Sequence, residues 1–446
     1  MKKHLALALC AACLLAGCSL STPADSSAGP AEVTAAPQEE RLYWSSVYYT
    51  GTTLGPGCTS ETGYYYATSR LSPAASGYVL CYVDFETARQ APVCASPNCT
   101  HDSESCTAFL PATDGGMPMP IFAGDKLVLQ YGGGAGTAPK VEVMGLDGTG
   151  RHKVCDLSSG VMWGSSVPSS EALYIVGLAY TYSGEGEQKQ VEGCESKLYR
   201  VSLTDGAMTE VYTFPENTND ILLLDVRDGQ MIFRTTALIS VDVYASLSEA
   251  AAAQETVFLA VTPEGESREL WRAPGNLGGM SVWDGVFYRA ESDWRTLYIR
   301  DLLTGDERTY TPDLPLDRGE VQYLTVTGCY GDWLALDVSF TGGAGYSRGE
   351  DTLGFACNTT TGEVRERTLR VLAKPELFST VPLPVMTRIG GTLLVENDRI
   401  PQQQTYQGSD GIPYYATNFS ERWALMSLED YLSSTPNYRD VAPLVE

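Results

Sequence analysis

Three cysteines and one histidine fall within thirteen residues of this 446-residue chain, in the pattern C-x4-C-x-H-x4-C. These four candidate metal or disulfide residues are Cys94, Cys99, His101 and Cys106. Three thiolates and an imidazole can complete a tetrahedral zinc site, and a full set of protein ligands leaves no open position for catalysis. A structural zinc ion is therefore the cofactor that the sequence suggests.

The spacing of this cluster matches no standard zinc module, so other interpretations stay open. In an oxidising compartment, a Cys99–Cys106 or Cys94–Cys106 disulfide is equally natural. A reactive thiol or a catalytic metal is a third alternative. In the two leading interpretations the segment is structural and does not take part in a reaction.

Other catalytic groups are scarce, and charge excludes one class of partner. Beyond the first 17 residues, His101 and His152 are the only histidines, which leaves few candidates for Ser-His-Asp or Cys-His chemistry. The chain has 30 Lys plus Arg against 55 Asp plus Glu, a formal net charge of −25. An acidic surface repels phosphate backbones, so nucleic-acid binding is disfavoured.

The elements that must position these residues recur along the chain. Apolar, strand-like segments alternate with short turns that carry Gly, Asp or Thr, and such residues tolerate the positive φ of tight hairpins. The turns include Gly124-Asp125, Asp228-Gly229, Asp284-Gly285, Gly331-Asp332 and Thr361-Gly362. The repeat length of roughly 40–65 residues fits a four-stranded propeller blade.

Seven such repeats can be counted between residue 41 and the end of the chain. They are centred near Tyr66, Leu127, Tyr174, Phe233, Phe287, Leu334 and Leu394. We therefore predict an all-β fold, a β-propeller of seven four-stranded blades over residues 41–446. Six or eight blades, or two stacked sandwiches, are the alternatives.

The meander of a blade predicts which face binds a ligand. The first and third turns of each blade lie at one face of the ring, and the middle loop and the link to the next blade lie at the other. The long segments 132–139, 181–195, 235–255, 341–351 and 400–419 are predicted to be middle loops, and the cysteine-histidine segment is expected in the link between blades one and two, at the same face. Aromatic rings in such loops suit sugar rings. The predicted ligand-binding residues are Tyr180, Tyr182, Tyr346, Tyr406, Tyr414 and Tyr415.

The N-terminus predicts where the protein is located. Lys2 and Lys3 precede an apolar run from Leu5 to Leu15, which is typical of a secretory signal and too short to span a bilayer. The following Leu-Ala-Gly-Cys, which ends at Cys18, resembles a bacterial lipobox. This resemblance implies a signal peptide over residues 1–17 and lipid on Cys18. Residues 18–40, rich in Ser, Thr, Ala and Pro, are predicted to be a disordered tether after the lipidated cysteine.

The chain as a whole resembles a group of bacterial surface lipoproteins that have propeller domains and no assigned activity. The resemblance rests on the lipobox, the repeat and the segment 93–101, VCASPNCTH. It implies a fold and an extracytoplasmic location, anchored to the membrane or envelope through lipid, but no reaction.

We therefore predict a binding or scaffold module for a glycan, peptide or protein partner. One alternative is an extracellular glycoside hydrolase or polysaccharide lyase that uses a carboxylate pair, although no pair stands out among the 55 acidic residues. Another alternative is a docking hub in envelope assembly.

Overall fold

A computed structural model describes most of the chain from Glu40 onward. The described residues are 40–44, 57–68, 77–111, 117–133, 137–184, 190–237, 246, 249, 253–275, 277, 279–315, 320–340, 352–374, 379–407 and 413–444. The predicted signal peptide and Cys18 lie outside this set, as does the predicted tether up to residue 39. Within the described residues, no helix is long and apolar enough to cross a membrane.

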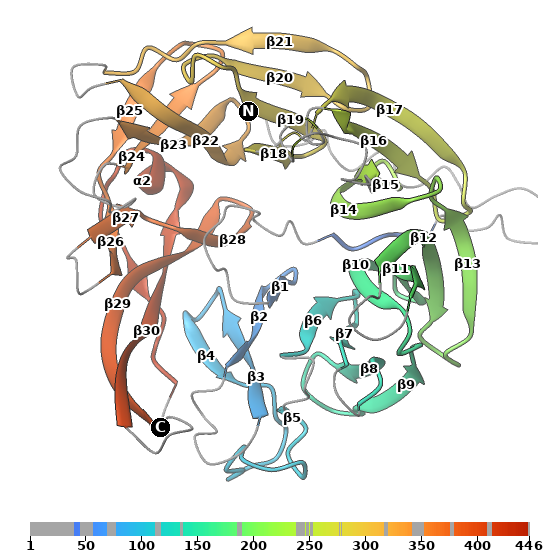
Figure 1. Ribbon diagram of the computed structural model, residues 1–446. Coiled ribbons are helices and arrows are strands. Elements are labelled where there is room, and N and C mark those ends of the chain that lie inside the picture. The colour runs from blue at the N-terminus through green and yellow to red at the C-terminus, as the bar shows by residue number, and fades with distance from the viewer. Residues whose placement is uncertain are drawn as a thin grey trace, which may run out of the picture. The chain divides into compact units, whose positions relative to one another are not determined.

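Seven antiparallel sheets of consecutive strands follow one another around a ring (Figure 1). Blade 1 contains β1 (Gly57–Thr59), β2 (Gly63–Thr68), β3 (Gly77–Asp84) and β4 (Arg89–Pro92), with β5 (Phe109–Pro111) also paired to β3. Blade 2 contains β6 (Met119–Phe122), β7 (Lys126–Tyr131), β8 (Lys140–Gly145) and β9 (His152–Asp156). Blade 3 contains β10 (Met162–Pro168), β11 (Ala172–Ser183), β12 (Gln190–Ser202) and β13 (Met208–Thr213).

The other four blades repeat this order. Blade 4 contains β14 (Thr218–Arg227), β15 (Gln230–Ala237), β16 (Glu255–Val261) and β17 (Ser267–Pro274). Blade 5 contains β18 (Met280–Trp283), β19 (Val286–Ala290), β20 (Leu297–Asp301) and β21 (Glu307–Tyr310). Blade 6 contains β22 (Val321–Tyr330), β23 (Trp333–Phe340), β24 (Thr352–Asn358) and β25 (Val364–Arg367). After the two-stranded sheet of β26 (Arg370–Lys374) and β27 (Ser379–Pro382), blade 7 contains β28 (Val385–Ile389), β29 (Thr392–Gln407), β30 (Pro413–Ser427) and β31 (Arg439–Asp440), with α2 (Leu428–Leu432) before β31.

The prediction of an all-β, seven-bladed propeller is confirmed. All seven predicted centres, from Tyr66 on β2 to Leu394 on β29, lie on the second strand of their blades. The alternatives of six or eight blades and of stacked sandwiches are wrong. The positions of the blades along the chain were predictable because the first and second strands of each blade are joined by a short turn, and such a turn favours residues that tolerate its backbone conformation.

The first turns of blades 4 and 5 show this preference. Asp228 and Gly229 join β14 to β15 with φ of 52° and 71°, and Asp284 and Gly285 join β18 to β19 with φ of 50° and 72°. A two-residue hairpin with both central residues at positive φ matches the right-handed twist of the strands. These turns and the third turns of the blades form one face of the ring, which we call the tight-turn face. The opposite face, formed by the middle loops and the links between blades, is called the loop face.

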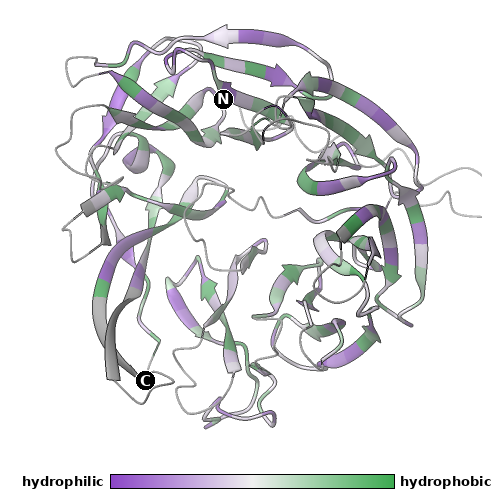
Figure 2. Cartoon of the chain, in the orientation of Figure 1, coloured by the Kyte–Doolittle hydropathy of each residue, from purple (hydrophilic) through white to green (hydrophobic). Residues whose placement is uncertain are grey.

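Apolar side chains between neighbouring blades hold the ring together. The inner strands carry most of the hydrophobic residues, whereas outermost strands such as β13 and β21 are largely exposed (Figure 2). Blades 1 and 7 share one core cluster, in which the ring centroids of Tyr66 and Trp423 lie 4.4 Å apart. Arg439 of blade 7 also donates to the carbonyl oxygen of Glu86 in blade 1, at 2.8 Å. The last blade therefore closes the ring against the first.

Two of the five predicted middle loops are wrong, because their residues continue as paired strands. β11 and β12 remain paired, with one register shift between Thr181 and Tyr182, out to the pair Ser183–Gln190, and β29 and β30 remain paired, with one shift between Glu396 and Asp398, out to the pair Gln407–Pro413. Segments 181–195 and 400–419 are therefore mostly extended hairpins. The other three segments do separate the second and third strands of their blades.

Candidate metal centre

The cysteine-histidine segment interrupts the outer strand of blade 1. β4 pairs with one end of β3 and β5 pairs with the other end, so together they form a split fourth strand. Between them, the N–H of Leu80 donates to the carbonyl oxygen of Ala108 at 2.8 Å, and the carbonyl oxygen of Leu80 accepts from the N–H of Val93 at 2.9 Å. Residues 94–107 therefore leave the strand and return to it at one point on β3.

This position corrects the sequence-based placement of the segment. We expected it in the link from blade 1 to blade 2, at the loop face. Instead, it is an excursion from the outer edge of blade 1, beside β4 and β5 (Figure 1). A cross-link within such an excursion would close a loop whose ends already meet.

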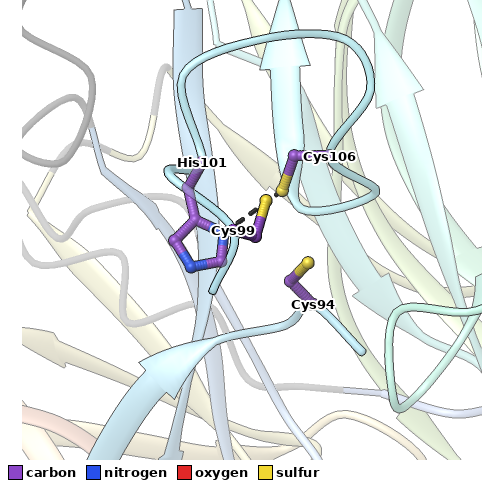
Figure 3. Close-up of side chains that lie close together, drawn as sticks. All are labelled: Cys94, Cys99, His101 and Cys106. Carbon is purple, nitrogen blue, oxygen red and sulfur yellow. Dashed lines mark hydrogen bonds between the residues drawn. The ribbon is translucent and has the colours of Figure 1, made fainter. Parts of the chain in front are cut away.

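The four predicted side chains converge inside this excursion (Figure 3). One ligand atom from each of Cys94, Cys99, His101 and Cys106 lies within 4.8 Å of the others. Nδ1 of His101 is 3.2 Å from Sγ of Cys106. In a tetrahedral zinc site, the bond lengths place neighbouring ligand atoms about 3.5–3.8 Å apart. The group could therefore hold a metal ion after only small side-chain adjustments.

The backbone of the excursion is held in a conformation that side chains rarely adopt. Asn98 has φ of 59° and His101 has φ of 57°. For residues with a Cβ, the left-handed region costs free energy and persists where surrounding contacts enforce it. These two positions bracket Cys99 and turn the chain so that its sulfur and the imidazole of His101 face the same small space.

The surroundings of the thiols shift their pKa values in opposite directions. Burial raises the pKa of Cys94, but hydrogen bonds from the Ser96 N–H, Cys106, Cys99 and Thr107 outweigh burial and leave it below the usual value. Burial, together with hydrogen bonding to Cys99, raises the pKa of Cys106 to about 12. A thiol must lose its proton to bind a metal, so binding at this cluster releases protons.

Blade 2 clamps the returning end of the excursion. Arg151, just before β9, donates to the carbonyl oxygens of Thr107 at 3.2 Å and of Phe109. Its guanidinium also bonds Oε2 of Glu142 and the hydroxyl of Tyr131, each at 2.8 Å. Burial raises the pKa of Glu142, but the cations of Lys140 and Arg151 outweigh burial and hold it below its usual value. This ion network fixes the backbone that follows Cys106.

None of the nine described cysteines, Cys58 onward, is in a disulfide. A Cys99–Cys106 or Cys94–Cys106 bond would use two of the three clustered sulfurs. The third thiol and the imidazole would then lie beside the disulfide without being bonded to it. A single metal ion could engage all four groups, whereas either disulfide would engage only two of them.

The predicted ligand-binding tyrosines lie on strands, in two separate blades. Tyr180 and Tyr182 both belong to β11, with ring centroids 6.2 Å apart, and Tyr182 is 48% exposed. Tyr406 on β29 is the cross-strand partner of Tyr414 on β30, and Tyr415 follows it. Tyr346 lies outside the described residues. The five described tyrosines therefore lie near the ends of two hairpins at the loop face, apart from the cysteine-histidine cluster.

The loop face carries a further feature that the sequence pattern does not predict. Among the described residues, six large apolar side chains are prominently exposed: Met119, Met162, Tyr182, Val191, Met208 and Tyr323. All but Met208 lie at strand ends directed to the loop face, because they begin an inner strand or lie near the tip of the β11–β12 hairpin. Met119 and Met162 each open the first strand of a blade after a link, and that position is the signal that could have identified them.

A groove of about 480 Å³ lies between blades 3 and 4. It contains the apolar side chains of Tyr212, Val257 and Leu259 together with Arg272. Arg272 is already bonded to Glu255 and Glu269, each at 2.7 Å. Its charge is thus neutralised within the groove.

No model of a known protein family matches this sequence, and no curated protein matches it. Solved structures with a similar backbone include a puromycin-hydrolyzing peptidase of Mycobacterium tuberculosis, at 11% identity and a TM-score of 0.48 over 92% of this chain and 56% of the peptidase. The chain thus spans little more than half of that protein. An oligogalacturonate lyase in complex with manganese is similar at 13% identity and a TM-score of 0.44, over 81% of this chain and 86% of the lyase. The lyase of Vibrio parahaemolyticus is similar at 10% identity and a TM-score of 0.43, over 81% and 88%.

The strand pairing defines the class of protein: an all-β propeller of seven four-stranded blades. The likenesses assign no activity to this chain, because they are below 25% in identity.

Proposed function

We propose that this protein is a lipid-anchored, extracytoplasmic binding module that holds a glycan, peptide or protein partner at its loop face. The observation that carries this proposal is that, among the described residues, five of the six prominently exposed apolar side chains lie toward that face, three of them in blade 3. Scattered exposed apolar residues are normal, whereas their concentration on one face is typical of an interaction site.

The chemistry of the loop face suits more than one class of partner. Tyr180 and Tyr182 offer aromatic surface with hydroxyl groups, which suits the C–H faces and hydroxyl edges of sugars. Met119 and Met162 offer adaptable apolar surface, which suits a peptide or protein. The acidic composition of the chain disfavours nucleic acid as the partner.

The test is binding of the mature chain, from residue 18, to an array of cell-wall, host and dietary glycans, with released sugars measured in parallel. Retention without products supports a capture module, whereas product release contradicts it in favour of a hydrolase or lyase. If no glycan is retained, cross-linking to envelope proteins tests the peptide or protein partner and the docking hub.

Blade 3 supplies a matched pair of variants for the binding test. Met162 is 62% exposed at the loop face, and Met208 is 45% exposed at the tight-turn face. We expect Met162→Ser to weaken binding about tenfold, as the loss of one buried apolar contact does, and Met208→Ser to leave it unchanged. Equal effects of the two substitutions would contradict the assignment of the loop face.

We also propose that Cys94, Cys99, His101 and Cys106 bind one structural zinc ion. Two observations support this proposal. The four ligand atoms converge, and all four residues belong to one excursion whose two ends are both bonded to Leu80. With four protein ligands, the ion would hold blade 1 together and would have no open position for a substrate.

The zinc proposal is tested by metal analysis of the mature chain prepared under reducing conditions. We expect one zinc per chain, and cobalt substitution should give the absorption of tetrahedral thiolate coordination. Cys106→Ser should lose the metal, whereas Cys155→Ser, a change of a half-buried cysteine outside the cluster, should keep it. A metal-free protein with a mapped Cys99–Cys106 disulfide would overturn the proposal.

Lipid attachment at Cys18 is tested separately. The wild-type protein should partition with membranes after expression in a bacterium, and Cys18→Ala should release it to the soluble extracytoplasmic fraction. Membrane association that persists in Cys18→Ala would contradict the anchor.

A further inference from the structure

The first described residues of the chain, 40–44, form a strap on the tight-turn face. Leu42 forms an antiparallel bridge with Ser169, in the turn between β10 and β11. The N–H of Tyr43 donates to the carbonyl oxygen of Pro168 at 2.8 Å. The strap is therefore bonded to the first turn of blade 3.

Side chains of the strap pack on both sides of this bridge. Tyr43 meets Phe122 of blade 2 edge to face, with ring centroids 5.6 Å apart. A Cβ added to Gly124, in the first turn of blade 2, would lie 2.6 Å from the hydroxyl oxygen of Tyr43. Leu42 and Trp44 pack against the core shared by blades 3 and 4. In an extended segment, successive side chains point to opposite sides. Tyr43 therefore contacts blade 2 while Leu42 and Trp44 contact the core of blades 3 and 4, and the strap joins the tight-turn faces of blades 2 and 3.

Glu40 fixes the point at which the chain leaves the propeller. Its carboxylate accepts from the hydroxyl of Tyr174 at 2.7 Å and from the hydroxyl of Ser169. The guanidinium of Arg200 lies 3.6 Å away. With three polar partners on blade 3, the segment that precedes residue 40 must start from the tight-turn face.

From this strap we infer that the anchored propeller holds its tight-turn face toward the membrane and presents its loop face away from it. The inference rests on the proposed lipid anchor at Cys18. The sequence of residues 19–39 predicts a flexible linker, and about 20 such residues span roughly 25 Å on average. Second strands such as β15 and β23, with eight residues each, rise about 26 Å from the tight-turn face toward the loop face. To bring the loop face to the bilayer, the linker would have to run along the whole height of the ring and use its full average span, so the tight-turn face is the one held nearer to the lipid.

The charge of the tight-turn face keeps it from lying flat on lipid. Its first and third turns carry fourteen exposed carboxylates and a single basic residue, Arg151, which is mostly covered. The fourteen are Glu61, Glu86, Asp125, Asp147, Glu171, Asp205, Asp228, Glu264, Glu266, Asp284, Asp306, Asp332, Glu363 and Glu429. Anionic headgroups repel such a face within a Debye length, about 8 Å at physiological salt. The propeller therefore does not lie flat on anionic lipid, and the loop face stays free for a partner.

Energy transfer to a dye on the lipid headgroups tests this orientation. The mature chain carries Cys18→Gly and is joined by a sortase to a synthetic lipid, so the result does not depend on lipidation in the cell. A donor dye is attached through a noncanonical amino acid, either at Asp332 in a first turn or at Glu192 on β12, and both positions are exposed.

We expect roughly twofold higher transfer from the donor at Asp332 than from the donor at Glu192, because the linker holds the tight-turn face nearer to the lipid. Anionic lipid should lower the transfer from Asp332, and added salt should restore it. Equal transfer from the two positions, or higher transfer from Glu192, would overturn the orientation.

A strap variant makes the test specific. A variant in which Glu40, Leu42, Tyr43 and Trp44 are all replaced by Gly loses the side-chain bonds and the packing of the strap, and the difference between the two donor positions should then shrink. An unchanged difference would show that the strap does not set the orientation. Failure of Cys18→Ala to release the native protein would instead count against the proposed anchor alone, so the two failures are distinguishable.

Discussion

At the tight-turn face, Asp228 and Gly229 reverse the chain of blade 4 in two residues, whereas at the loop face residues 238–254 separate β15 from β16 in the same blade. Blades 2 and 6 likewise combine a first turn of two or three residues with a middle segment of eight or more residues. At the tight-turn face, backbone conformation restricts which residues can be present. At the loop face, only the strand ends are restricted, so sequence is free to vary with the partner.

Hydrogen bonds between neighbouring blades occur near both faces, and near the loop face the hydroxyl of Ser196 in blade 3 donates to the carbonyl oxygen of Thr218, the first residue of β14. At the tight-turn face, Asp225 of blade 4 accepts from the N–H of Gly285 in blade 5, and Lys126 of blade 2 donates to the carbonyl oxygen of Ser170 in blade 3 at 2.9 Å. Arg439 binds Glu86 there across the ring closure. Bonds near the tight-turn face therefore contribute to the stability of the ring, and the proposed function assigns recognition to the exposed apolar residues described at the loop face.

The largest expected effect of a single change at the tight-turn face is that of Gly148→Ala. Gly148 has φ of 85°, and a Cβ there would lie 2.2 Å from the carbonyl oxygen of Val93. The backbone of the turn or of the cysteine-histidine excursion must then shift, and we expect a loss of about 3 kcal/mol in the free energy of unfolding. Urea denaturation followed by tryptophan fluorescence measures it.

Gly229→Ala is the matched control. Gly229 has a similar φ of 71°, but nothing lies within 4 Å of an added Cβ. Only the backbone strain remains, at about 1 kcal/mol. Because Val93 precedes Cys94, we also expect Gly148→Ala to reduce zinc content and Gly229→Ala to keep it. Equal losses of stability in the two variants would mean that the contact with Val93 does not restrict the turn.

The next effect concerns pH and the bond between blades 4 and 5. Burial raises the pKa of Asp225 to about 6, although the N–H groups of Gly285 and Val226 oppose the shift. The folded protein therefore keeps this proton at pH values where the unfolded chain, with a pKa of about 3.9, has released it. The contribution of Asp225 to stability is present below pH 4 and falls as the pH rises through 6, by about 3 kcal/mol in all and by about half of that above pH 5.

Asp225→Asn separates this effect from every other titrating group. From pH 5 to pH 7.5, the wild type should lose unfolding free energy relative to Asp225→Asn, because only the wild type has the titrating carboxyl group. Urea midpoints at several pH values measure the shift. A difference that is constant across this range would show that Asp225 is ionised in the folded protein at pH 5.

The contrast between the faces also explains what could be predicted from the sequence. Turn chemistry is local: Asp228-Gly229 and Asp284-Gly285 need no distant partner, so the blades and their number were predictable. The four residues of the candidate metal centre were also predictable, because they lie within thirteen positions.

Features that depend on distant partners were not predictable. The split outer strand exists because Leu80 bonds both Val93 and Ala108, and no local pattern marks either residue. Likewise, the strap depends on Ser169. The extended hairpins of β11–β12 and β29–β30 are not predictable from local pattern, because polar and aromatic residues there replace the expected apolar alternation.

The smallest expected effect on stability is at the loop face. Tyr182 and Val191 are cross-strand partners near the tip of the β11–β12 hairpin, and both side chains are nearly half exposed. Truncating them together, as Tyr182→Ala with Val191→Ala, removes contacts that solvent already surrounds, so the free energy of unfolding should fall by less than about 1 kcal/mol. The same double variant should weaken partner binding more than Met208→Ser does, because it removes two of the five apolar side chains at that face. A large loss of stability with unchanged binding would show that the two faces do not divide these roles, and would assign the exposed hairpin to the fold.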